Sequence, residues 1–251
     1  MEKYFEINES PYNIKCKIYC NDIKAVRRPT VFCHGFGGHK DNKAAARFAD
    51  RLLSSHKDAA LVAFDWPCHG DDVRKRLTLA DCGEYLDLVL KYLRTQLDCQ
   101  DIYGYSTSFG SYLTLKYIVE NGSPFKKAAL RCPAVNMYEV ITGSIITPDE
   151  LAALSKGKDV LVGFDRKIKI SPQFLSELRE ADISRLSFLD QSEGLLILHG
   201  TKDEIVPFEA VRAFADDNLI EFIPVENADH RFVDPRKMDA AIKYILDFFQ
   251  L

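Results

Sequence analysis

The chain has 251 residues and is 47% hydrophobic, which suffices for one large core, or one core with an insertion, and argues against two equal domains. Its 33 lysines and arginines nearly balance its 37 aspartates and glutamates, and the net charge of -4 offers no attraction for nucleic acid or an anionic membrane. No apolar run has the length of a signal-peptide core or a membrane span. We therefore expect no nucleic-acid or membrane partner, and a homodimer is left open.

The seven cysteines are odd in number and lack the paired spacing of a zinc site or a disulfide framework. Reduced thiols are typical of the cytoplasm, where disulfides are rare. We therefore expect a cytoplasmic protein with no bound metal.

The first segment, residues 4–20, contains alternating positions typical of an antiparallel hairpin at a sheet edge. Thr78 and Asp234 are expected helix N-caps, because their side chains can accept hydrogen bonds from free backbone N–H groups. Short apolar runs predict buried strands at 30–33, 60–65, 102–105, 128–132, 195–199 and 219–224. Helical periodicity lies at 44–54, 79–97, 109–119 and 208–215, and again after Pro235.

Strands that alternate with helices in this way predict a doubly wound, mostly parallel α/β sheet. The ligand crevice of such a sheet lies at the carboxyl ends of its strands, so residues just after each strand are the candidates for function. Residues 136–185 exceed the usual length of a connection, and we interpret them as an inserted lid. The core then comprises residues 1–135 and 186–251.

Residues 106–110, Ser-Thr-Ser-Phe-Gly, connect a predicted strand to a predicted helix, which is the context of a nucleophile elbow. The nucleophile could be Ser106 or Ser108. We favour Ser108, because that frame places Gly110 where the strand and helix backbones pass closest and leaves a complete strand ahead of the turn.

A serine hydroxyl needs a neutral histidine as base and a carboxylate that orients this histidine. Asp203 follows the fifth predicted core strand and His230 follows the sixth, so both loops are expected at the same sheet edge as Ser108. Glu204, next to Asp203, is an alternative acid. The order serine, acid, histidine along the chain matches one known order of such a triad.

Backbone N–H groups must also stabilise the negative oxygen that develops in the transition state. Residues 34–38, His-Gly-Phe-Gly-Gly, form a glycine-rich turn after the first core strand, and the N–H of Phe36 is the expected first donor. The N–H of Phe109, just after the nucleophile, is the expected second donor. The turn lacks the ending of a phosphate-binding loop and the six-residue glycine fingerprint, so a nucleotide site is not expected.

Together these motifs resemble the α/β-hydrolase superfamily, and within it the small serine aminopeptidase-like hydrolases and the cinnamoyl or feruloyl esterases. The resemblance covers residues 31–249 and implies the α/β-hydrolase fold. It rests on the turn at 34–38, on residues 64–70, which are similar to the family segment D-x-x-G-H-G, on the elbow, on the loop at 200–207 and on His230. The chain departs from the family pattern at Ser106 and Ser111, where glycine is usual, and at Cys68, which precedes His-Gly in place of glycine.

The predicted activity is that of a serine carboxylesterase which forms an acyl-enzyme on Ser108 and needs no metal or organic cofactor. A thioesterase, an amidase or peptidase with the same residues, and a non-catalytic binding protein of the same fold are left open. A haloalkane- or epoxide-type hydrolase would need a carboxylate in the elbow, and none lies there.

The lid carries Tyr138, Phe164 and Phe174, which we expect to bind the substrate. A lid of about fifty residues can bury little by itself, so some of its apolar side chains should rest on the core and line the pocket. Such a compact roof suits a small-molecule ester with a short acyl chain or an aryl group, such as a hydroxycinnamoyl ester.

Overall fold

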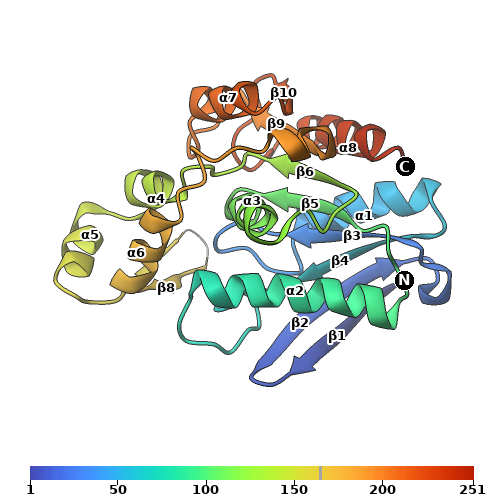
Figure 1. Cartoon of the computed structure of the whole chain (residues 1–251), viewed down its shortest axis with the longest axis horizontal. Coiled ribbons are helices and arrows are strands. Elements are labelled where there is room, and N and C mark those ends of the chain that lie inside the picture. The colour runs from blue at the N-terminus through green and yellow to red at the C-terminus, as the bar shows by residue number, and fades with distance from the viewer. Residues whose placement is uncertain (164–165) are drawn as a thin grey trace.

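The computed structural model describes residues 1–163 and 166–251, and its centre is a sheet of eight strands. These strands are β1 (Glu2–Glu9), β2 (Tyr12–Cys20), β3 (Arg28–Cys33), β4 (Ala59–Phe64), β5 (Tyr103–Thr107), β6 (Lys127–Arg131), β9 (Leu195–Gly200) and β10 (Glu221–Val225). Their order is β1-β2-β4-β3-β5-β6-β9-β10, as Figure 1 shows. The β1–β2 and β2–β4 pairs are antiparallel and the others are parallel, so the predicted doubly wound sheet with an edge hairpin is confirmed.

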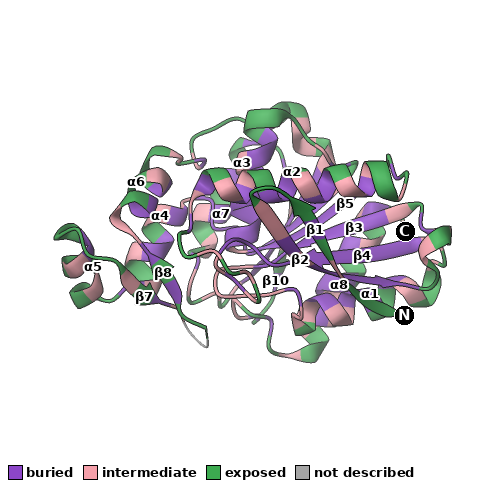
Figure 2. Cartoon of the chain, turned by 90° about the horizontal axis from the view of Figure 1, so that it is seen from below, coloured by how far each residue is buried: buried purple, intermediate pink, exposed green. Residues whose placement is uncertain are grey.

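Helices cover both faces of this sheet, because its strands are apolar on both sides. On β3, Val31 belongs to one buried cluster and the next residue, Phe32, to the other. The first cluster includes residues of α2 (Leu79–Gln96), α3 (Phe109–Asn121) and α7 (Phe208–Asp217), and the second includes residues of α1 (Lys43–Ser55) and α8 (Pro235–Phe249). The strands between the helices are largely buried (Figure 2). Among the described helices, none combines the length and apolarity needed to cross a membrane.

Local side-chain chemistry sets where several helices begin. Thr78 accepts a hydrogen bond from the N–H of Asp81 at the start of α2, and Asp234 accepts one from the N–H of Arg236 at the start of α8. Both predicted N-caps are therefore confirmed. The predicted strand boundaries differ from the observed ones by one or two residues. β5, for example, extends to Thr107, and β10 begins at Glu221 because Leu219, predicted within it, has a φ of 55° and is exposed in a turn.

The segment 136–185 forms its own group of short elements. These are α4 (Met137–Val140), a π-helical turn (Ile141–Ile145), α5 (Pro148–Ser155), the hairpin of β7 (Val160–Val162) and β8 (Ile168–Ile170), and α6 (Pro172–Glu180). The labelled elements α4, α5, α6 and β8 lie together on the left of Figure 1. Glu177 accepts a hydrogen bond from the N–H of Leu79, and Ser144 donates one to the carbonyl of Ile205, so the segment contacts the core at two separated places.

Candidate active site

Ser108 lies at a sharp turn between β5 and α3. Its φ of 52° and ψ of -118° are sparsely populated by residues other than glycine, so the surrounding packing must hold this conformation. A Cβ on Gly110 would lie 2.2 Å from the carbonyl oxygen of Cys33, which explains why only glycine fits there. Ser106 lies inside β5, and its buried hydroxyl has no hydrogen-bond partner in the described structure. Of the two serines that the sequence left in competition, the turn therefore exposes Ser108.

His230 joins Ser108 to Asp203 by two hydrogen bonds. The Nε2 atom of His230 is 3.0 Å from Oγ of Ser108, and its Nδ1 atom is 2.8 Å from Oδ2 of Asp203. Asp203 follows β9 and His230 follows β10, and parallel strands bring these loops to the same edge as the serine turn. The structure thus brings together three residues that are far apart in the sequence.

The carboxylate of Asp203 is buried and held by several donors. Its Oδ1 accepts hydrogen bonds from the backbone N–H groups of Ile205 and Val206, at 2.9 and 2.8 Å. Burial by itself would raise the pKa of Asp203, but hydrogen bonds from His199 and His230 outweigh it and hold this pKa well below the ordinary value. Asp203 is therefore a carboxylate at neutral pH.

Glu204, the alternative acid, has a different position. Its carboxylate accepts a hydrogen bond from the backbone N–H of His230, at 3.3 Å, and the imidazole Nδ1 atom bonds to Asp203 instead. Glu204 therefore contacts the main chain of the histidine loop, and Asp203 contacts the ring.

The two predicted oxyanion donors lie beside each other at the serine turn. The rings of Phe36 and Phe109 meet edge to face, with centroids 5.9 Å apart. Gly35 brings the Phe36 turn close to the serine, since a Cβ on Gly35 would lie 3.2 Å from Cβ of Ser108. Neither Phe36 nor Phe109 donates its backbone N–H to an acceptor among the described residues, so neither group is already used by another hydrogen bond.

A buried histidine, His69, to which the sequence pattern assigns no catalytic role, lies next to these two aromatic residues. The ring of His69 contacts Phe36 edge to face at 5.6 Å and Phe109 in a stacked arrangement at 6.3 Å. Burial lowers the pKa of His69 to about 4, so the ring is neutral at neutral pH. In the sequence, only the position of His69 in the D-x-x-G-H-G-like segment 64–70 singles it out. That position does not show which side chains the ring contacts.

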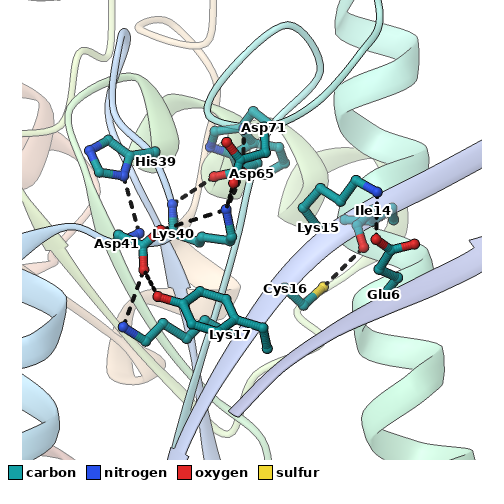
Figure 3. A network of polar contacts seen from close by, with 12 residues as sticks. Glu6, Ile14, Lys15, Cys16, Lys17, His39, Lys40, Asp41, Asp65 and Asp71 are labelled. Atoms are coloured by element: carbon teal, nitrogen blue, oxygen red, sulfur yellow. Dashed lines mark hydrogen bonds and ion pairs between the residues drawn. The ribbon is translucent and has the colours of Figure 1, made fainter. Parts of the chain in front are cut away.

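A polar network holds the loop after β3 against the loop after β4 (Figure 3). Asp65 is fully buried and accepts hydrogen bonds from the backbone N–H of Lys40, at 2.7 Å, from its Nζ atom, at 3.0 Å, and from the N–H of Asp71, at 2.8 Å. A Cβ on Gly70 would collide with this carboxylate. The network supports the turn that carries Phe36, four residues before Lys40.

The three residues predicted to bind substrate have different environments. Tyr138 is half-buried and lines a cavity of about 230 Å³ between α4 and α6, where its hydroxyl accepts a hydrogen bond from Arg179. Phe174, in α6, is fully buried and packs against Phe109, with centroids 6.3 Å apart, so its side chain belongs to the hydrophobic core. Phe164 lies outside the described residues.

One group of side chains near the site has the atoms for metal binding. The ligand atoms of Cys132, Asp203 and His230 lie within 4.8 Å of one another. Burial raises the pKa of the Cys132 thiol well above its ordinary value, which opposes formation of the thiolate that a metal would require. The arrangement is therefore better suited to proton transfer between Ser108 and His230 than to holding an ion.

The fold agrees with comparisons to known proteins. No curated protein sequence matches the chain significantly. A putative hydrolase from Agrobacterium vitis S4 is 15% identical, with a TM-score of 0.77 over 99% of this chain and 98% of the other. Est1E from Butyrivibrio proteoclasticus with bound ferulic acid is 20% identical, with a TM-score of 0.75 over 98% of this chain and 100% of the other.

A third structure, a soluble variant of monoglyceride lipase from Saccharomyces cerevisiae in complex with a substrate analogue, is 12% identical. Its TM-score is 0.72, over 98% of this chain and 94% of the other. At such identities the three structures show a shared fold. The model of the alpha/beta hydrolase family matches residues 30–241, which is most of the sequence, and the chain therefore belongs to this family.

Proposed function

We propose that this hydrolase is a serine carboxylesterase whose catalytic residues are Ser108, His230 and Asp203. The observation that carries the proposal is the pair of hydrogen bonds from one imidazole, 3.0 Å to the serine hydroxyl and 2.8 Å to the buried carboxylate. This arrangement activates a serine for attack on a carbonyl carbon.

In the first half-reaction, Oγ of Ser108 attacks the ester carbonyl while its proton passes to Nε2 of His230. The N–H groups of Phe36 and Phe109 stabilise the oxyanion, and Asp203 stabilises the imidazolium. The carbon–oxygen bond of the ester then breaks, and the leaving alcohol takes the proton from His230. In the second half-reaction, His230 takes a proton from water while the water oxygen attacks the acyl carbon. As the bond between the acyl carbon and Oγ of Ser108 breaks, His230 returns this proton to Oγ and the carboxylic acid leaves.

We further propose that the substrates are short-chain or aryl esters, including hydroxycinnamoyl esters. The ring of Phe36 is partly exposed beside the serine turn and suits a flat or short acyl group, whereas the Phe109 ring that it meets is fully buried. Tyr138 remains the proposed substrate contact from residues 136–185, and the cavity of about 230 Å³ that it lines does not include Ser108, His230 or Asp203 among its lining residues. Similarity to Est1E, which was solved with ferulic acid, supports the aryl class.

The cysteines are free thiols, which supports a location in the reducing cytoplasm.

The test is a hydrolysis panel with p-nitrophenyl esters of increasing acyl length, methyl ferulate, acyl-CoA and aminoacyl anilides, in which Ser108→Ala is the blank. We expect the highest kcat/KM on a short-chain or hydroxycinnamoyl ester. Preference for acyl-CoA, anilides or long-chain esters would overturn the substrate class and keep the catalytic serine. If a fluorophosphonate does not label the folded protein, the catalytic proposal is wrong and a binding function replaces it.

A further inference from the structure

His199, the fifth residue of β9, is fully buried beside the proposed catalytic acid and has no part in the steps above. Its Nε2 atom lies 3.1 Å from the carbonyl oxygen of Val206 and 3.2 Å from Oδ2 of Asp203. Its Nδ1 atom is buried and has no partner in the part of the chain that the structure describes.

These contacts determine where the ring carries its hydrogen. Both neighbours of Nε2 are oxygen atoms that can only accept a hydrogen bond, so Nε2 must be the donor. Nδ1 meets no acceptor among the described residues, so a hydrogen there would be buried without a partner. The ring of His199 therefore points a single N–H between the Val206 carbonyl and the Asp203 carboxylate.

This N–H completes the set of donors around Asp203. Two backbone N–H groups bind Oδ1, and the rings of His230 and His199 both face Oδ2. We infer that His199 is a positioning residue for the catalytic acid: its Nε2–H holds Oδ2 of Asp203 toward Nδ1 of His230 and anchors the loop through Val206. The inference rests on the proposed function, in which Asp203 orients His230.

Loss of this donor should change catalysis in a specific way. With one donor fewer, the Asp203 carboxylate becomes more basic and stabilises the protonated form of His230 more strongly. A larger fraction of the enzyme then has a protonated His230, which cannot accept the proton of Ser108, at a given pH. The other titratable groups here are Cys132, whose buried thiol stays protonated, and Glu204, which bonds to the backbone of His230. We therefore expect an acid limb of the kcat/KM profile displaced to higher pH. We also expect a lower kcat, because Oδ2 of Asp203 is no longer held toward Nδ1 of His230. KM should change little, because His199 has no exposed surface that a substrate could touch.

The test compares two substitutions at this position with a packing control. His199→Met removes the donor and keeps the volume, whereas His199→Gln keeps an N–H where Nε2 now lies. Phe208→Leu alters a side chain whose ring meets His199 edge to face at 5.8 Å and donates nothing to Asp203. Hydrolysis is measured per phosphonate-titrated active site, so that misfolded protein does not count.

We expect His199→Met to lower kcat by about 10- to 100-fold, as for loss of a hydrogen bond to a charged group. KM should stay within about twofold, and His199→Gln should recover most of the loss. Equal effects in His199→Met and Phe208→Leu, or a Met variant with the wild-type kcat and pH profile, would overturn the inference.

A proton NMR measurement covers the case in which the Met variant is too unstable for kinetics. The downfield resonance of the His230 Nδ1 proton, assigned with selectively labelled histidine, should move in His199→Gln or His199→Met and stay in place in Phe208→Leu. An unmoved resonance in both His199 variants would overturn the inference. If the wild type hydrolyses no ester and resists the phosphonate, the proposed function has failed, which is distinguishable from an active wild type whose His199 variants behave normally.

Discussion

Gly110, in the first turn of α3, lies directly against the backbone of Cys33 at the end of β3, where any Cβ would meet the Cys33 carbonyl oxygen at 2.2 Å. Gly110→Ala should therefore push the helix away from β3 and displace Ser108. We expect a loss of about 1–3 kcal/mol in the free energy of unfolding, measured with urea, together with a large fall in kcat. Gly83→Ala in α2 is the matched control. A Cβ added there would lie more than 4 Å from any described atom outside its own stretch of helix, and alanine should stabilise the helix by about 0.5–1 kcal/mol. A fully active, stable Gly110→Ala protein would contradict the close contact.

The two serines of the turn should respond differently to alanine. Ser108→Ala should lower kcat by about four to six orders of magnitude and leave the fold intact, because it removes the attacking oxygen. Ser106→Ala should be mild, since the Ser106 hydroxyl is buried in β5 and has no partner among the described residues. Mass spectrometry of the phosphonate adduct identifies the labelled serine, and an adduct on Ser106 would refute the assignment.

The two neighbouring acids should also differ. Asp203→Asn should reduce kcat by about 10⁴-fold, because an amide favours the wrong tautomer of His230. Glu204→Gln should have little effect, since the amide oxygen of glutamine can still accept the hydrogen bond from the His230 backbone. Steady-state kinetics of both variants on the best ester measures the two kcat values. Similar losses of kcat in the two variants would leave the identity of the catalytic acid open.

The depressed pKa of Asp203 predicts a contribution to stability that depends on pH. This contribution is fully present above the ordinary aspartate pKa, about 4, and is lost as the pH falls through the lower pKa of the folded state. The difference in unfolding free energy between the wild type and Asp203→Asn should therefore stay constant from pH 7 to about 5 and shrink as the pH falls below about 4. Urea unfolding of both proteins at each pH measures this difference in free energy. A difference that stays constant down to pH 3 would show that the pKa of Asp203 is not depressed.

The buried thiols should react slowly in the native protein. Burial raises the pKa of Cys33 and of the partly buried Cys68 to about 12, so little thiolate is present at neutral pH. We expect slow reaction with a thiol reagent such as DTNB, beginning at Cys68, and release of all seven thiols in denaturant. A Cys68→Ser variant serves as the control, and rapid reaction that persists in it would show that another cysteine is accessible.

Much of the architecture was predictable because it follows from local patterns. Apolar runs that alternate with amphipathic segments can be buried only as a sheet covered on both faces, and the structure has this arrangement. The side chains of Thr78 and Asp234 act on their own helix ends, so sequence context was sufficient to place them. The hairpin of β7 and β8 was not predicted, because strands of three residues carry too little periodicity.

Part of the candidate site could likewise be predicted from the sequence, and part could not. The sequence determined which residues follow the strands, and parallel strands necessarily bring Ser108, Asp203 and His230 to one edge. Only the tertiary structure decided that His199 faces the acid and that Phe174 is enclosed by the core. Such contacts depend on the distance and direction of side chains from separate elements, which hydrophobic periodicity and motif spacing do not encode.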